Sequence, residues 1–269
     1  MRNSRNKQQS WTGYVSVDDT RLAVTDTGGE GPAVVYLNGA YSSQPAWRHV
    51  ITELGPGWRH ITFDERARGR SKKSADYSFE GTIRDLDAVL TARGVERVLL
   101  VGWSFGAAVA VHWAVRNPDR ARGLVLVDGG YPYDWVDEAA EAQIRQQFRR
   151  MRLFIPLLAR VGMAAHMTAD QHAEVNIEIN RVFGALGNCY DRLTAPVRFV
   201  VASGASMGGT ESELARMRAT LDPVLDRRPN IQVSATATGN HVTILRKDYR
   251  AVADAVRQAA DVATRTETS

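Results

Sequence analysis

A serine with a glycine on either side stands in the stretch Gly102-Trp103-Ser104-Phe105-Gly106. The apolar run 98–101 before it predicts a short buried strand, and the Ala- and Val-rich run 107–115 after it predicts a helix. A strand-to-helix corner of this kind is tight, so a Cβ at either glycine would collide with the backbone. The turn lifts the hydroxyl clear of the sheet, beside the N–H groups that begin the helix. The stretch therefore predicts that Ser104 is a nucleophile.

A serine hydroxyl attacks well only when a base removes its proton, and histidine suits this task near neutral pH. Of the six histidines, only His241 is expected on a loop directly after a strand and late in the chain. We therefore predict His241 as the base. The others fall in expected helices, at a strand start or in a helical insertion: His49, His60, His112, His166 and His172. No two of the six stand four residues apart beside an acid, so the sequence predicts no metal site and no cofactor.

An acid is needed to hold the imidazole in the correct tautomer. Asp128 comes directly after the expected strand 123–127, which follows the helix after Ser104. The loop after the expected strand 197–201 is the usual alternative place, and its first carboxylates are Glu211 and Glu213. Both glutamates fall in the first turn of an expected helix, where they complement the helix dipole. We favour Asp128, with the two glutamates as alternatives.

Acyl transfer also requires N–H donors for the oxyanion that develops in the transition state. The N–H of Phe105 follows the nucleophile directly. A second donor is expected after the strand 33–37, from Ala40 or Tyr41, because Gly39 lets the backbone approach closely.

Strands that alternate with helices predict how these residues come together. Strands are expected at 33–37, 61–63, 98–101, 123–127, 197–201 and 231–237, helices at 47–54, 79–93, 107–115 and 249–263, and a hairpin over 13–17 and 21–25. This alternation predicts an α/β fold with a mostly parallel sheet covered on both faces. Ligands bind beyond the carboxyl ends of such strands. Four polar residues fall there: Asn38, Asp64, Ser104 and Asp128.

Strand signals stop between Tyr131 and Leu193, where helices are expected over 139–154 and 169–186. We therefore predict a core domain formed by residues 1–130 and 194–269, with a disordered head over 1–10, and an inserted helical lid over 131–193. Most apolar side chains of the lid are expected to pack within it, but some must cover the site. The expected substrate contacts are Trp103 and Asn38 from the core and Phe154, Met163, Met167 and Phe183 from the lid.

Composition limits the remaining possibilities. The 269 residues are 44% hydrophobic and 24% charged, as in ordinary globular proteins. Cys189 is the only cysteine, so no internal disulfide can form. The net charge is +4, and the arginines between 145 and 152 follow acidic residues at 137–141, which indicates a solvated helix face. With a polar amino terminus and no long apolar run, the chain is expected to be cytoplasmic and to bind neither nucleic acid nor membrane.

Together these residues resemble the α/β-hydrolase superfamily over nearly the whole chain, from 13 to 263. The resemblance rests on Asn38-Gly39, Asp64-x-Arg66-x-x-Gly69-x-Ser71, Gly102-x-Ser104-x-Gly106, Val127-Asp128 and His241. It implies Ser104 as nucleophile, His241 as base and a lid that selects the substrate. Two positions depart from the pattern, because most relatives have histidine in place of Asn38 and glycine in place of Ala67.

An acid after the sixth strand resembles certain dehalogenases and lactone hydrolases. Dehalogenases and epoxide hydrolases use an aspartate nucleophile, however, so Ser104 argues against both activities. Our hypothesis is a hydrolase that cleaves a carboxylic ester, lactone or thioester of a mainly apolar small molecule through an acyl-serine intermediate. Two alternatives stay open: a C–C bond hydrolase or cyclase/thioesterase of secondary metabolism, and a catalytically silent protein that binds a small ligand.

Overall fold

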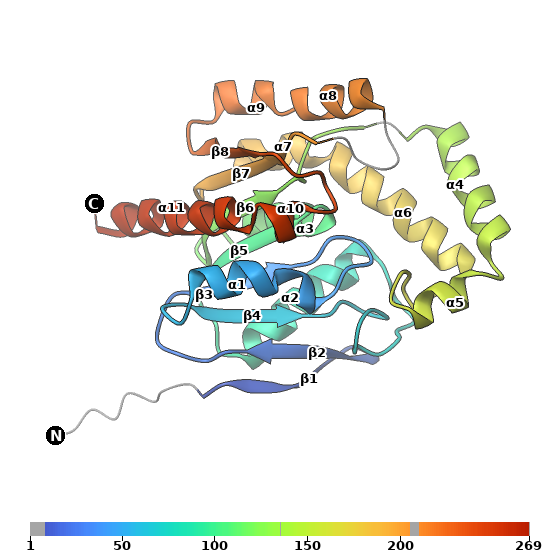
Figure 1. Ribbon diagram of the computed structural model, residues 1–269, viewed down its shortest axis with the longest axis horizontal. Helices are drawn as coiled ribbons and strands as arrows, with labels where there is room; N and C mark the ends of the chain where they lie inside the picture. Colours follow the sequence, from blue (N-terminus) through green and yellow to red (C-terminus); the bar gives the residue numbers. More distant parts are fainter. Residues whose placement is uncertain (1–8, 135, 205–209, 269) are drawn as a thin grey trace.

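An eight-stranded sheet forms the centre of the molecule (Figure 1). The computed structural model describes residues 9–134, 136–204 and 210–268, and the predicted head therefore lies mostly outside the described residues. The strands are β1 (Trp11–Val17), β2 (Thr20–Asp26), β3 (Ala33–Leu37), β4 (Arg59–Phe63), β5 (Val98–Trp103), β6 (Ala121–Val127), β7 (Val197–Ala202) and β8 (Ile231–Ala237). Their spatial order is β1-β2-β4-β3-β5-β6-β7-β8. Only the β1–β2 and β2–β4 pairs are antiparallel, so the predicted α/β fold is confirmed.

Side chains of the central strands alternate between two apolar layers. Leu100 of β5 packs with α2 (Phe79–Ala92) and α3 (Phe105–Arg116) on one face. Leu99 and Val101 pack with α1 (Arg48–Leu54), α10 (Ile244–Lys247) and α11 (Tyr249–Thr268) on the other. Because both faces are covered, these strands have continuous apolar sequences. A short 3₁₀ helix, Gln44–Trp47, precedes α1, and α8 (Glu211–Ala219) and α9 (Asp222–Arg227) join β7 to β8.

The segment between β6 and β7 is helical, as predicted, but its helices divide differently. It forms α4 (Glu138–Met151), α5 (Ile155–Arg160), α6 (Ala169–Gly184) and α7 (Leu186–Arg192). The expected helix over 139–154 ends early, and α5 starts separately with Pro156 in its first turn, where a missing N–H costs nothing. In Figure 1, α4, α5 and α6 lie to the right of the sheet. Leu186 and Tyr190 of α7 are instead fully buried in the main core, so part of the predicted lid segment belongs to the core.

A buried polar network joins the ends of β3 and β4. The side-chain amide of Asn38 donates to the Phe63 carbonyl at 2.8 Å and to Glu65 at 3.1 Å, and its oxygen accepts from Trp47 at 2.9 Å. The Asn38 N–H donates to the other Glu65 oxygen at 3.3 Å. Asn38 is 1% exposed. Its side chain is thus committed inside the protein, which corrects its prediction as a substrate contact.

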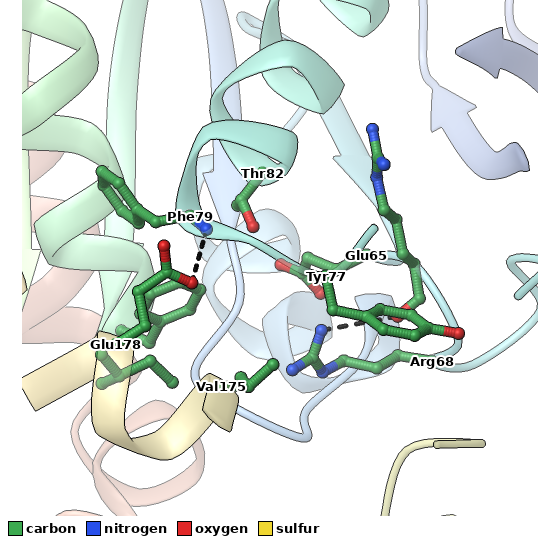
Figure 2. Close-up of a pocket in the computed structure, with 10 residues that line it drawn as sticks. Glu65, Arg68, Tyr77, Phe79, Thr82, Val175 and Glu178 are labelled. Carbon is green, nitrogen blue, oxygen red and sulfur yellow. Dashed lines mark hydrogen bonds between the residues drawn. The ribbon is translucent and has the colours of Figure 1, made fainter. Parts of the chain in front are cut away.

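Glu65 lines a narrow cavity of about 10 Å³, which has room for one water (Figure 2). The guanidinium of Arg68 lines the same cavity, makes a long 3.5 Å bond to the Arg66 carbonyl and lies over the Tyr41 ring. Burial raises the pKa of the Glu65 carboxyl to about 7, although the charge of Arg68 and the Asn38 hydrogen bonds act in the opposite direction. Glu65 is therefore a buried acid that can titrate near neutral pH.

This titration predicts how stability depends on pH. Between pH 4.5, the ordinary value, and pH 7, the native protein holds a proton on Glu65 that the unfolded chain has lost. The free energy of unfolding should therefore fall as pH rises through this window, by on the order of 3 kcal/mol from this group. Glu65→Gln should remove that component in urea unfolding at pH 5 and pH 8. Glu211→Gln, at an exposed position, should keep the wild-type dependence. An unchanged pH dependence in Glu65→Gln would contradict the assignment.

Candidate active site

Ser104 occupies the corner between β5 and α3, as the sequence predicted. Its backbone has φ 55° and ψ −116°, a left-handed conformation that is costly for a residue with a side chain. A Cβ on Gly102 would clash with the Gly106 carbonyl, and a Cβ on Gly106 would clash with the Leu37 carbonyl. The corner thus closes only because both glycines lack side chains.

His241 lies on the loop after β8 and is paired with Asp128. Its Nδ1 is 2.8 Å from the Asp128 carboxylate, across 113 positions of sequence. The carbonyl of His241 accepts a hydrogen bond from the Trp103 indole at 3.1 Å, and the two rings lie 5.5 Å apart. Trp103 therefore supports the histidine loop. It does not line the cavity in front of Ser104, where it was predicted to contact substrate.

The Asp128 carboxylate is held on both oxygens. One oxygen accepts from the Tyr131 hydroxyl at 3.0 Å and from the Ala202 N–H at 3.1 Å, and the other faces His241. Burial alone would raise the pKa of this carboxyl, but the hydrogen bonds outweigh it and lower the pKa below its ordinary value. Asp128 is thus a buried carboxylate that stays ionised.

The two alternative acids lie elsewhere. Glu211 and Glu213 stand in the exposed first turn of α8. Glu213 forms a capping box with Thr210, as the sequence pattern indicated. The carboxylate beside the imidazole is that of Asp128.

A cavity of about 130 Å³ opens in front of these residues. Its lining comes from the sheet edge, the insertion and α8: Ser104, Asp128, Gly129, Tyr131, Tyr133, Asn180, Phe183, Met217 and His241. Ser104 and His241 therefore share one small, mainly apolar space. Within the described part of the chain, no hydrogen bond joins the Ser104 hydroxyl to the imidazole.

Of the four substrate contacts predicted in the insertion, only Phe183 lines this cavity. Met167 is buried in a separate small cluster with Ala67 and Val175. Phe154 and Met163 are 63% and 71% exposed, because α5 lies at the outer end of the insertion. These three side chains therefore do not line the cavity in front of Ser104. The cavity is lined instead by Tyr131, Tyr133, Asn180 and Met217, which no sequence pattern marked.

The loop after β3 lies against the start of α3. A Cβ on Gly39 would contact the Trp103 ring, and Tyr41 has a left-handed φ of 66°. The Tyr41 hydroxyl is 2.6 Å from the Asn176 amide and 3.1 Å from His172, both on α6. The backbone of Gly39 thus lies against Trp103 of the nucleophile corner, and the oxyanion roles of Phe105, Ala40 and Tyr41 stay predictions.

Two further findings concern cofactors and membranes. In residues 9–134, 136–204 and 210–268, no three His, Cys, Asp or Glu side chains are grouped to hold a metal ion. No helix in the same ranges combines the length and apolarity that crossing a bilayer requires. Ala67, where the resemblance implied glycine, adopts a left-handed φ of 59° and is fully buried.

Comparison with known proteins identifies relatives by sequence. A haloalkane dehalogenase from Mesorhizobium japonicum is 34% identical over 140 residues, which is 51% of this chain and 45% of that protein. Epoxide hydrolase B from Mycobacterium tuberculosis is 39% identical over 100 residues, 36% of this chain and 28% of that protein. A synthase of 2-succinyl-6-hydroxy-2,4-cyclohexadiene-1-carboxylate from Serratia proteamaculans is 30% identical over 114 residues, which is 42% of this chain and 44% of that protein. The matches span less than half of the length of these relatives.

Solved structures share the fold over nearly the whole chain. An esterase from Thermogutta terrifontis superposes with a TM-score of 0.71 at 19% identity, covering 95% of this chain and 99% of the esterase. A thioesterase domain from the curacin biosynthetic pathway has a TM-score of 0.64 at 16% identity, covering 93% of this chain and 99% of the thioesterase domain. The family model described as alpha/beta hydrolase fold matches residues 32–183, more than half of the sequence. The chain therefore belongs to the alpha/beta hydrolase fold family.

Proposed function

We propose that this chain is a serine hydrolase that cleaves a carboxylic ester, lactone or thioester with a short, mainly apolar acyl group. The observation that carries the proposal is that Ser104 and the His241–Asp128 pair open onto the same small apolar cavity. Hydrolytic enzymes among the relatives and structural neighbours support the class of reaction. The serine supports acyl transfer over dehalogenation or epoxide opening, for which an aspartate nucleophile is expected.

The state of the imidazole follows from its partner. An ionised carboxylate only accepts hydrogen bonds, so Nδ1 of His241 carries the proton toward Asp128. Nε2 then keeps its lone pair and can remove the Ser104 proton when substrate enters. The serine and histidine close into a hydrogen bond at that stage, as catalytic groups often do only in the complex.

The reaction then proceeds in two halves. Ser104 Oγ attacks the acyl carbon, and the oxyanion is stabilised by the N–H of Phe105 and by that of Ala40 or Tyr41. His241 gives its new proton to the leaving alcohol or thiol, which leaves an acyl-serine. Water, deprotonated by His241, attacks this ester and releases the acid and free Ser104.

The helical insertion is proposed to act as a lid over this cavity. Asn180 and Phe183 of α6 form one wall, while Tyr131 and Tyr133 come from the chain that leads into the insertion. Its shape, more than the serine chemistry, sets which acyl group fits.

C–C bond hydrolysis or cyclisation is the second candidate. The Serratia synthase among the relatives favours it. Such a reaction would use the same three residues, and product analysis on an ester and on a diketone would separate the two reactions.

Removal of the nucleophile tests the proposal directly. Ser104→Ala should reduce turnover of p-nitrophenyl butyrate by about a thousandfold or more, since the remaining site offers only binding and oxyanion stabilisation. Labelling by a fluorophosphonate probe should disappear as well. Ser234→Ala, in an exposed hydrogen bond to Gln258, should retain both properties. If wild type is neither active nor labelled, the chain is a silent ligand-binding protein.

The acid can be tested by neutralising each carboxylate in turn. Asp128→Asn should lower kcat/KM by about 10³–10⁴-fold, because an amide favours the wrong imidazole tautomer. Glu213→Gln and Glu211→Gln, which are remote from the imidazole, should remain within about twofold of wild type. The reverse ranking of these variants in ester hydrolysis would move the acid to α8.

The volume of the cavity predicts acyl-chain preference. Wild type should favour acetyl and butyryl esters over decanoyl esters, since about 130 Å³ accommodates only a few carbon atoms. Phe183→Ala should enlarge this space and shift the optimum to longer chains. Phe154→Ala, at an exposed position outside the cavity, should leave the profile on soluble esters unchanged. An identical chain-length profile in Phe183→Ala and wild type would contradict the assignment of this cavity.

A further inference from the structure

Five large apolar side chains are exposed within eleven residues at the outer end of the insertion. These residues expose between 59% and 79% of their surface, and they are Leu153, Phe154, Leu157, Val161 and Met163. Ile155 and Ala159 of α5 are buried on the opposite side and anchor the helix to the insertion. In Figure 1, α5 lies at the lower right edge of the molecule, away from the sheet. We call residues 153–163 the apolar tip.

Exposed arginines lie within the apolar tip and directly before it in the sequence. Arg149, Arg150, Arg152 and Arg160 are exposed, and the sequence from 142 to 169 contains no aspartate or glutamate. Arg149 lies 3.8 Å from Asp170, with both side chains mostly in solvent. Across the ranges that the structure covers, Arg150, Arg152 and Arg160 form no ion pair. The tip thus combines unshielded apolar surface with cations that lack internal partners.

This combination points to one kind of partner. A bilayer with anionic lipids offers negative headgroups to arginines and, a few ångströms deeper, an apolar layer to leucine and phenylalanine side chains. A second copy of the chain fits less well, since a symmetric contact between tips would bring arginines against arginines. We propose that the apolar tip docks the protein on an anionic lipid surface.

Docking of this kind requires no spanning helix, so the absence of one among the described residues is compatible with it. The proposal departs from the expectation that the chain binds no membrane. That expectation rests on the arginines as a solvated helix face, and the sequence alone does not show that the apolar residues beside them are exposed.

The tip is separate from the catalytic cavity. The helix α6 spans 16 residues, or about 24 Å. Its amino-terminal end follows the tip in sequence, whereas Asn180 and Phe183, near its carboxyl-terminal end, line the cavity. Docking and turnover of a soluble ester can therefore be measured independently, and failure of one leaves the other standing.

The test measures partition of the full chain onto vesicles by cosedimentation. Vesicles of pure phosphatidylcholine are compared with vesicles that also contain about 30% phosphatidylglycerol, at roughly 0.05 and 0.5 M NaCl. Wild type should bind only the anionic vesicles, and less at high salt. Phe154→Ser/Leu157→Ser should lower the partition coefficient about tenfold or more, because it removes the inserted apolar surface.

A charge variant separates the two contributions. Arg152→Gln/Arg160→Gln should lower binding about tenfold and weaken its salt dependence. Matched exposed positions outside the tip, Val233→Ser and Arg250→Gln, should bind like wild type. All variants should keep the wild-type unfolding midpoint and the wild-type kcat/KM on p-nitrophenyl butyrate, because the substituted side chains are exposed and outside the cavity.

Three results would overturn the proposal. The first is that wild type fails to bind anionic vesicles, or binds neutral ones equally. The second is that Phe154→Ser/Leu157→Ser binds as wild type does. The third is that light scattering finds a dimer that this variant converts to monomer without any effect of vesicles, which would assign the tip to an interface between copies.

Discussion

The approach of Gly106 to the Leu37 carbonyl is the constraint on which the site depends. No side chain fits between the start of α3 and the end of β3, so the two backbones touch. This contact fixes the left-handed turn at Ser104, and it holds the carbonyls of Leu37 and Asn38 against the start of α3. Strain at Ser104 is tolerated because the strand before it and the helix after it are both buried in the core. The positions of the Ser104 hydroxyl and of the proposed donor at Phe105 are therefore set by one steric contact.

The base and the acid are positioned by a second, electrostatic arrangement. Asp128 directly follows β6 with a φ of 39°, and its carboxylate accepts from Tyr131, from the Ala202 backbone and from His241. Three segments that are remote in sequence thus meet at one buried charge. Removal of any donor would raise the cost of keeping that charge in the interior. The Asp128 carboxylate, which orients the imidazole, therefore also joins the end of β6 to β7 and to the loop after β8.

Local sterics and strand order made much of this arrangement predictable. Ser104 follows from two glycines between a strand and a helix, and Asp128 and His241 follow from their places after parallel strands, whose carboxyl ends share one edge. Asn38 also stands at that edge, but its amide turns inward to Glu65, which lies 27 positions later and gave no sign in the sequence. Apolar character could not show which way an insertion helix faces. Phe154 and Phe183 look alike in sequence, yet one is in solvent and the other lines the cavity.

The contacts of α6 limit how an inserted lid could move. Asn176 and His172 hold the Tyr41 hydroxyl, and Glu178 accepts the N–H of Phe79 at the start of α2, at 2.9 Å. Figure 2 shows the Glu178 contact beside the narrow cavity that Glu65 lines. Lifting α6 would break all three bonds and would release the loop that carries the proposed oxyanion donors. The helices α4 and α5 form no such bonds to the sheet domain in the described residues, since their side-chain partners, Glu174, Asp170 and Arg181, are on α6. Any opening that preserves the site must therefore move the outer helices over a fixed α6.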